Sequence, residues 1–293
     1  MELTWVKALR IRQWFKQLLI FLPLIATGNT FVPSDLLDIT IGAFTFSFVS
    51  SAIYLINDVA DKDSDREDPI KASRPVASGK ISSLAAIATS LFLLTTAAVI
   101  LIATTLENTL LISLVLGIYF IMNLAYSLLK LKRFRILGIS LVAIGFPARF
   151  AFGSLIIDLP FSVWAVVLIF ELAMFMLSGK RFQNVSREKS FSGDEYANER
   201  RFWVLSMVVF AAFFGSTFSG FISDSNVIET WGRSYLISST IPLSMGIVRF
   251  IEIVSIPSAS RLKGATEDMV TDSFLLFVIF LFSFVLFLGR LNA

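Results

Sequence analysis

An apolar helix runs directly into a cluster of carboxylates at residues 52–65, whose sequence is AIYLINDVADKDSD. Asp58, Asp61 and Asp65 follow one another at positions i, i+3 and i+7. On a continued helix this spacing places the three carboxylates on one face, within reach of one another. The three negative charges repel one another, so this arrangement is stable only if cations lie between the carboxylates. Oxygen ligands of this kind suit Mg²⁺, which commonly bridges carboxylates to a phosphate or diphosphate. The stretch therefore predicts a magnesium site with a phosphate-bearing substrate.

The segment that follows the aspartates is basic. Lys71, Arg74 and Lys80 supply the cationic donors that phosphate oxygens need. A charge run after a membrane-spanning helix is often only a solvated loop. The helical phase of the aspartates favours a binding site over that alternative.

The composition is that of an integral membrane protein. The 293 residues are 56% hydrophobic and include 30 Phe, and the mean hydropathy is +0.78. The absence of Cys excludes disulfides and thiolate metal sites, and the absence of His excludes haem, histidine-ligated zinc and a histidine base. The chemistry must therefore use carboxylates, Lys, Arg, Tyr, Ser, Asn and bound metal.

Hydropathy predicts an all-α, polytopic membrane protein with one domain over residues 1–293. About 20 apolar residues cross a bilayer. On that basis we predict nine spans, at residues 17–33, 36–57, 82–104, 108–128, 136–157, 160–178, 204–222, 234–251 and 272–290.

The distribution of Lys and Arg predicts the orientation of these spans. All of the 25 Lys and Arg residues lie on one predicted side, except Arg149, Arg233, Arg249 and Arg290. The positive-inside rule then places the N-terminus and the large connectors in the cytoplasm. We expect an integral protein of the inner (plasma) membrane. Residues 1–16, with Trp5 and Trp14, are predicted to form an amphipathic segment at the membrane interface.

Arg149 lies inside a predicted span, where a guanidinium is costly unless it is paired or lines a wet cavity. We therefore expect it to be functional. Glu171, Arg249 and Glu252 also lie in or near spans, and a structural network is the preferred interpretation for them. Tyr126, Lys130 and Lys132 close one span on the predicted cytoplasmic side, and Lys180 and Arg181 close another. They are candidate anion ligands, with membrane anchoring and topology as the ordinary alternatives.

Several of these motifs resemble a known family. The pattern Asn57-Asp58-x-x-Asp61-x-x-x-Asp65, followed by Pro69-x-Lys71-x-x-Arg74-Pro75-x-x-Ser78-Gly79, resembles the first aspartate motif of the UbiA superfamily of intramembrane prenyltransferases. Three further segments resemble the decaprenyl-phosphate phosphoribosyltransferase branch. They are Tyr126-Ser127 with Leu131-Lys132, Gly145-Phe146-x-x-Arg149-x-x-x-Gly153, and Gly179-Lys180-Arg181.

The resemblance implies helices around a cytoplasm-facing cavity. It also implies Mg²⁺-dependent transfer of 5-phosphoribose from 5-phosphoribosyl 1-diphosphate to a polyprenyl phosphate, for envelope glycan precursors, with the bilayer and no nucleic acid as partner. On this hypothesis catalysis falls to Asp58, Asp61, Asp65 and Arg149, with the metal on the three aspartates. Substrate binding falls to Asn57, Lys71, Arg74, Tyr126, Lys130, Lys132, Lys180 and Arg181.

The sequence departs from the family pattern at its second acidic position, where Gly138 stands in place of a carboxylate. The first aspartate motif is complete. One alternative function keeps the metal site but transfers a polyprenyl group from its diphosphate to an aromatic acceptor. The other is a non-catalytic lipid-binding or transport protein.

Overall fold

The computed structural model describes residues 2–26, 32–69, 71–104, 108–159, 162–187, 193–255 and 272–292. These residues form helices and, within the described ranges, no strand, which confirms the predicted all-α class. Eight helices are long and apolar enough to cross a membrane. The chain divides into two compact units, Met1–Ser162 and Val163–Ala293.

The eight long helices correspond to eight of the nine predicted spans. The remaining prediction, residues 17–33, covers the end of a 3₁₀ helix and the short helix α2, and its residues 27–31 lie outside the described residues. The helices of the first unit are α1 (Glu2–Ala8), η1 (Ile11–Phe21), α2 (Leu22–Ala26), α3 (Pro33–Ala60), α4 (Lys62–Glu67), η3 (Lys71–Ser73), α5 (Ser83–Ala103), α6 (Thr109–Leu128), η4 (Leu131–Arg133) and α7 (Arg135–Ile156).

Helix α3 is the central helix of the first unit. The buried share of its most apolar stretch is 61%, whereas the buried share of the corresponding stretch is 28% in α5 and 17% in α6. It begins with Pro33 in the first turn, where a missing N–H costs nothing, and Asp35 lies favourably at the positive end of the helix dipole. Phe46, Val49 and Ile53 from α3 are fully or almost fully buried. Asp58 thus lies at the end of the best-anchored helix.

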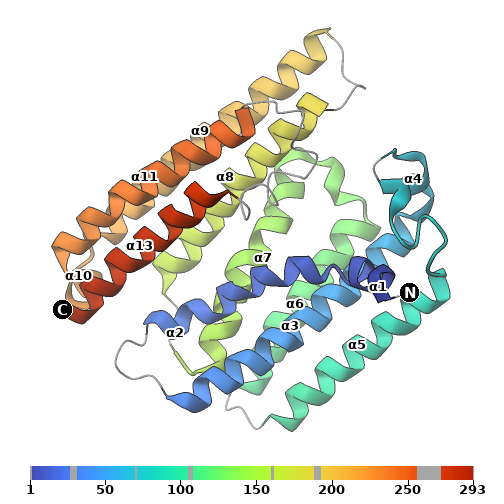
Figure 1. Cartoon of the computed structure of the whole chain (residues 1–293), viewed down its shortest axis with the longest axis horizontal. Coiled ribbons are helices and arrows are strands. Elements are labelled where there is room, and N and C mark those ends of the chain that lie inside the picture. Colours follow the sequence, from blue (N-terminus) through green and yellow to red (C-terminus); the bar gives the residue numbers. More distant parts are fainter. Residues whose placement is uncertain are drawn as a thin grey trace. The chain divides into compact units, whose positions relative to one another are not determined.

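The N-terminal segment crosses this core (Figure 1). Helix η1 packs against both α3 and α7. A Cβ atom at Gly153 of α7 would overlap the backbone carbonyl of Ile20 in η1. Glycine at this position therefore allows the two backbones to approach closely. Gln17 and Ile20 of η1 are buried, and both lie in residues 17–33, which we predicted as the first span.

The described part of the second unit consists of long helices with one short connecting helix. They are α8 (Val163–Arg187), α9 (Gly193–Phe221), α10 (Ser225–Trp231), α11 (Arg233–Ser255) and α13 (Ser273–Asn292). Helix α8 packs along α9, and α11 packs along α13. Trp164 fits over Gly220, and its indole N–H donates to Asp224 at 3.3 Å.

Candidate functional site

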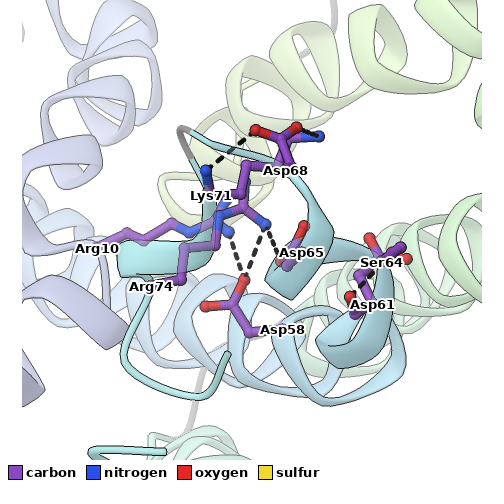
Figure 2. Close-up of polar contacts among 8 residues, drawn as sticks. All are labelled: Arg10, Asp58, Asp61, Ser64, Asp65, Asp68, Lys71 and Arg74. Atoms are coloured by element: carbon purple, nitrogen blue, oxygen red, sulfur yellow. Dashed lines mark hydrogen bonds and ion pairs between the residues drawn. The ribbon is translucent and has the colours of Figure 1, made fainter. Parts of the chain in front are cut away.

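Two buried carboxylates share one guanidinium at the end of α3. Arg74 Nη1 lies 2.7 Å from Asp65 Oδ2 and 3.4 Å from Asp58 Oδ1. The side chains of Asp58 and Asp65 are 3% and 4% exposed. Figure 2 shows both carboxylates turned toward Arg74. A buried carboxylate is stable as an anion only with a close cation or several donors, so Arg74 balances this pair.

A second arginine reaches Asp58 from the N-terminal segment. Arg10 Nη2 lies 2.7 Å from Asp58 Oδ1, and its guanidinium lies 4.5 Å from the centre of the Tyr54 ring. Arg10 adopts the left-handed backbone conformation, with φ 51° and ψ 44°. This conformation is unfavourable for a residue with a side chain, and it forms the turn between α1 and η1. We refer to Asp58, Asp65, Arg10 and Arg74 as the acidic site.

Asp61 does not join the acidic site. Helix α3 ends at Ala60, and α4 begins at Lys62, so Asp61 itself is non-helical with φ −93° and ψ 5°. Figure 2 shows Asp61 beside Ser64, away from the Asp58–Arg74–Asp65 group. The structure therefore differs from the continued helix that we expected, because the break changes the helical phase after Asp58. The metal-binding role of Asp61 stays a prediction.

The loop after α4 holds Arg74 in place. Pro75, Val76 and Ala77 are buried, and Val76 packs with Leu55 of α3 in a hydrophobic cluster. Arg66 Nε donates to the backbone carbonyl of Ala77 at 2.9 Å. Apolar residues directly after Arg74 therefore anchor a charged side chain that must face the carboxylates.

Lys71 lies nearby but pairs with a different carboxylate. Its Nζ is 2.8 Å from Asp68 Oδ2, and its side chain is 47% exposed. The backbone N–H of Lys71 also donates to Asp68 Oδ1 at 3.1 Å. Lys71 thus lies at the solvent edge of the acidic site in this structure, and its contact with substrate stays a prediction.

Arg149 lies inside the first unit and is only 4% exposed. Its Nε donates to Gln17 Oε1 at 2.7 Å, and its Nη2 lies 3.1 Å from the Tyr119 hydroxyl and 3.5 Å from Ser50 Oγ. Nη1 donates to the carbonyl of Gly145. The guanidinium also lies over the Phe46 ring at 4.6 Å. All of these partners are uncharged.

Lys16 adds a second cation beside Arg149. Its Nζ donates to Gln13 Oε1 at 2.9 Å. Burial, followed by the positive charge of Arg149, lowers the pKa of Lys16 to about 8. We refer to Lys16, Gln17, Ser50, Tyr119 and Arg149 as the Arg149 cluster.

Polar contacts connect the Arg149 cluster with the acidic site. Gln13 Oε1 accepts from Lys16 and, at 3.1 Å, from the hydroxyl of Tyr54, whose ring lies under Arg10. Arg10, Gln13 and Lys16 are spaced by three residues. A 3₁₀ helix has three residues per turn, so Gln13 and Lys16 share one face of η1, and Arg10 is the N-cap, one residue before the helix begins. We did not predict any of them as site residues. The three-residue spacing was the available signal, but it has this meaning only if the segment is 3₁₀ and packed.

The other predicted site residues lie elsewhere in the chain. Tyr126 is half-buried on α6, and Lys130 is exposed just after that helix. Within the described part of the first unit, neither forms a hydrogen bond or ion pair with Asp58 or Asp65. Lys132 belongs to η4, and its side chain lies outside the described residues. Lys180 and Arg181 belong to α8 of the second unit, and the substrate-binding role of all five residues stays a prediction.

The charged residues within the spans of the second unit have close partners. Arg249 donates to Glu252 at 2.7 Å and to Asp272 at 2.7 and 3.3 Å. Glu171 accepts from Thr217 at 3.0 Å. These contacts agree with the structural network that we preferred for Arg249 and Glu252, and they add Asp272 to it.

The donor atoms of the acidic site fit Mg²⁺. Asp58 and Asp65 are hard oxygen ligands, and a single cationic nitrogen already contacts both. Asn57 Oδ1 is buried without a hydrogen-bond partner in the described part of the chain. The described residues contain no group of three or more carboxylates placed to hold a metal. Mg²⁺ is commonly bound by one or two carboxylates together with substrate phosphates and water, so two aspartates suffice.

The family follows from comparison with known proteins. Residues 18–263 match the UbiA prenyltransferase family. The chain belongs to this family. Membership of the UbiA family, together with the eight long apolar helices, identifies it as an integral membrane protein and a transferase.

Relatives of this UbiA protein include two transferases from mycobacteria. It is 28% identical to the decaprenyl-phosphate phosphoribosyltransferase of Mycolicibacterium smegmatis, over 94% of this chain and 88% of that protein. It is 29% identical to the protein of the same name from Mycobacterium tuberculosis, over 90% of this chain and 86% of that protein. Among solved structures, a UbiA homologue from Archaeoglobus fulgidus bound to DMAPP and Mg²⁺ has the same fold, with a TM-score of 0.66, 17% identity, and coverage of 99% of this chain and 100% of that one.

Proposed function

We propose that this UbiA protein transfers 5-phosphoribose from 5-phosphoribosyl 1-diphosphate to a polyprenyl phosphate. A phosphate oxygen of the lipid attacks C1 of the ribose, and the bond from C1 to the diphosphate oxygen breaks. The bonding electron pair leaves with the diphosphate. The products are a polyprenyl-phosphoryl 5-phosphoribose and diphosphate. The observation that carries the proposal is the pair of buried carboxylates, Asp58 and Asp65, bridged by one cationic nitrogen.

Asp58 and Asp65, with Asn57 and Asp61 as further oxygen donors, would hold Mg²⁺. When bound, the metal stabilises the negative charge that develops on the departing diphosphate. Arg74 and Arg10 are already next to these carboxylates and supply donors for phosphate oxygens. Lys71, at the exposed edge, adds a further cation, and we propose the same role for Lys180 and Arg181.

The acceptor side of the reaction requires little from the protein in the way of acid–base chemistry. A phosphate monoester has its second pKa at about 6, so the attacking oxygen is already anionic at neutral pH. A chain without His can therefore carry out this transfer. We propose Arg149 as the residue that orients the lipid phosphate, with Tyr126, Lys130 and Lys132 as further contacts.

We propose that the chain works as a single UbiA-like domain of nine spans in the plasma membrane, with the N-terminus and the active site facing the cytoplasm. The family match at residues 18–263 covers parts of both compact units, which supports one domain. The charge asymmetry of the connectors supports the orientation. The names of the mycobacterial relatives support the choice of donor and acceptor.

A transfer assay with the purified chain in detergent tests this function. Labelled 5-phosphoribosyl 1-diphosphate and a polyprenyl phosphate are incubated with Mg²⁺ or with EDTA, using the wild type, Asp58→Asn and Asp63→Asn. Asp63 is a matched control because its side chain is 94% exposed on the same segment. We expect labelled lipid only with Mg²⁺, and only from the wild type and Asp63→Asn.

Folded wild-type protein that forms no labelled lipid would overturn the proposal. A parallel arm with labelled prenyl diphosphate and an aromatic acceptor measures the alternative transfer. Product in that arm alone would assign the acidic site to a prenyl donor.

A further inference from the structure

The Arg149 cluster holds two cations that have no carboxylate partner within the described ranges. Arg149 contacts Gln17, Ser50, Tyr119 and a backbone carbonyl. Lys16, the residue before Gln17 on η1, donates to Gln13. Buried charges are normally paired with an opposite charge or bound to a ligand. The acidic site follows that rule with two arginines on two aspartates, whereas the Arg149 cluster carries an excess of positive charge.

The neutral partners of Arg149 are readily exchanged for an anion. Gln17, Ser50 and Tyr119 accept weaker hydrogen bonds than a phosphate oxygen does, because charge-assisted hydrogen bonds are roughly twice as strong as neutral ones. The guanidinium has a planar set of donors suited to two phosphate oxygens, and the Lys16 ammonium adds a point charge from the residue before Gln17, which Arg149 contacts. A phosphate monoester with two negative charges would balance the two cations.

The core side of the cluster is aromatic. Arg149 lies over the ring of Phe46, and Phe46 contacts Phe152 and Tyr119 edge-on or tilted, with ring centres 5.2 and 4.6 Å apart. These rings belong to an apolar core of the first unit. Phe46 and Phe152 are fully buried, so these rings support the guanidinium from the core side, and the nature of the ligand beyond its phosphate follows from the proposed function.

We propose that Lys16, together with Arg149, binds the phosphate of the polyprenyl phosphate acceptor, in a subsite separate from the acidic site. The identity of this ligand rests on the proposed function. Gln13, Tyr54 and Arg10 connect the subsite with Asp58, so an acceptor held there lies along the row of polar contacts that leads to the donor. Lys16 is thus assigned to acceptor binding.

Binding of farnesyl phosphate to the detergent-solubilised full chain tests the subsite without any transfer. Farnesol and inorganic phosphate are the comparison ligands, because they carry the tail and the head alone. We expect farnesyl phosphate to bind at least about tenfold more tightly than either one. Lys16→Met and Arg149→Gln should lower that affinity by about ten- to hundredfold, the range expected when a charged hydrogen-bond partner is lost.

Two further variants separate charge from structure. Lys16→Arg keeps the positive charge and should retain most of the affinity. Lys7→Met removes an exposed lysine from the same N-terminal segment and should bind as the wild type does.

Hydrogen–deuterium exchange on the wild type gives a readout that needs no variant. Farnesyl phosphate should protect amides of residues 13–20, whereas 5-phosphoribosyl 1-diphosphate should protect residues 58–79.

The inference is wrong if Lys16→Met binds farnesyl phosphate as tightly as the wild type, or if residues 13–20 gain no protection. It is also wrong if inorganic phosphate binds as tightly as farnesyl phosphate, since the site would then recognise a free anion. Failure of the proposed function has a different signature. In that case no phosphoribosyl transfer occurs, and binding of farnesyl phosphate still depends on Lys16.

Discussion

The acidic site and the Arg149 cluster lie in the same compact unit, yet their charges are arranged in opposite ways. Asp58 and Asp65 are each held by an arginine within 2.7 Å. Arg149 is almost as deeply buried, but its hydrogen-bond partners are an amide, two hydroxyls and a carbonyl. A site whose charges are already balanced can exchange one cation for another, such as a metal ion. A site with excess positive charge favours an anion, and this difference separates donor chemistry from acceptor binding.

The largest expected effect is at the acidic site. Asp58→Asn removes the carboxylate that Arg10 and Arg74 share, together with one proposed metal ligand. We expect kcat/KM for phosphoribosyl transfer to fall by about 10²–10³, the usual cost of losing one preorganised charge contact to a transition state. Initial rates with wild type, Asp58→Asn and the exposed control Asp63→Asn measure this effect. Near-normal activity in Asp58→Asn would show that the acidic site takes no part in the reaction.

The next effect concerns the contact that brings η1 to the Arg149 cluster. Gly153→Ala places a methyl group against the carbonyl of Ile20. We expect the free energy of unfolding to fall by about 1–3 kcal/mol, as for other overpacked positions. Thermal unfolding in detergent measures the change.

Gly117→Ala is the matched control for that variant. Gly117 also lies within a long helix of the first unit, but nothing lies within 4 Å of an added Cβ. Alanine has the higher helix propensity, by about 1 kcal/mol, so this change should leave stability equal or slightly higher. Equal melting temperatures for the two variants would contradict the close approach of η1 to α7.

These two regions also show what sequence reasoning could find. Asp58, Asp65 and Arg74 were predictable because acidic and basic residues directly after an apolar run are conspicuous. Arg149 was predictable because a guanidinium inside a span is costly. Lys16 and Arg10 were missed because a basic segment with Trp residues also has the composition of an interfacial anchor. Only the packing of η1 onto Gly153 distinguishes the two. Asp61 was misplaced because the break after Ala60 has no proline or glycine to mark it.

A smaller, pH-dependent effect distinguishes the two regions further. Lys16 has a pKa lowered to about 8, and only its ammonium form attracts a phosphate. As the pH rises through about 8, the unliganded enzyme loses this charge, and KM for the lipid acceptor should rise between pH 7 and pH 9. Arg149, Arg10 and Tyr119 are the other charged or titratable groups near Lys16.

Lys16→Arg is the control for the pH profile, because arginine stays protonated over this range. In that variant KM for the acceptor should stay flat from pH 7 to pH 9. A rise of the same size in both proteins would assign the pH dependence to another group.

The smallest effect is expected at the edge of the acidic site. Lys71 pairs with Asp68, and its side chain is 47% exposed. Exposed ion pairs contribute about 0–1 kcal/mol, so Lys71→Met should raise KM for the phosphoribosyl donor by less than about fivefold. Donor titrations at saturating acceptor measure this change. A loss as large as that of Asp58→Asn would place Lys71 at the centre of the site.

Steady-state kinetics with both substrates varied test the separation of donor and acceptor sites most directly. Asp65→Asn and Lys16→Met are compared with the wild type at several concentrations of 5-phosphoribosyl 1-diphosphate and of polyprenyl phosphate. We predict that Asp65→Asn raises KM for the donor and leaves KM for the acceptor nearly unchanged, whereas Lys16→Met does the reverse. If both variants raise the same KM, or both KM values equally, the two regions form one site and the account is contradicted.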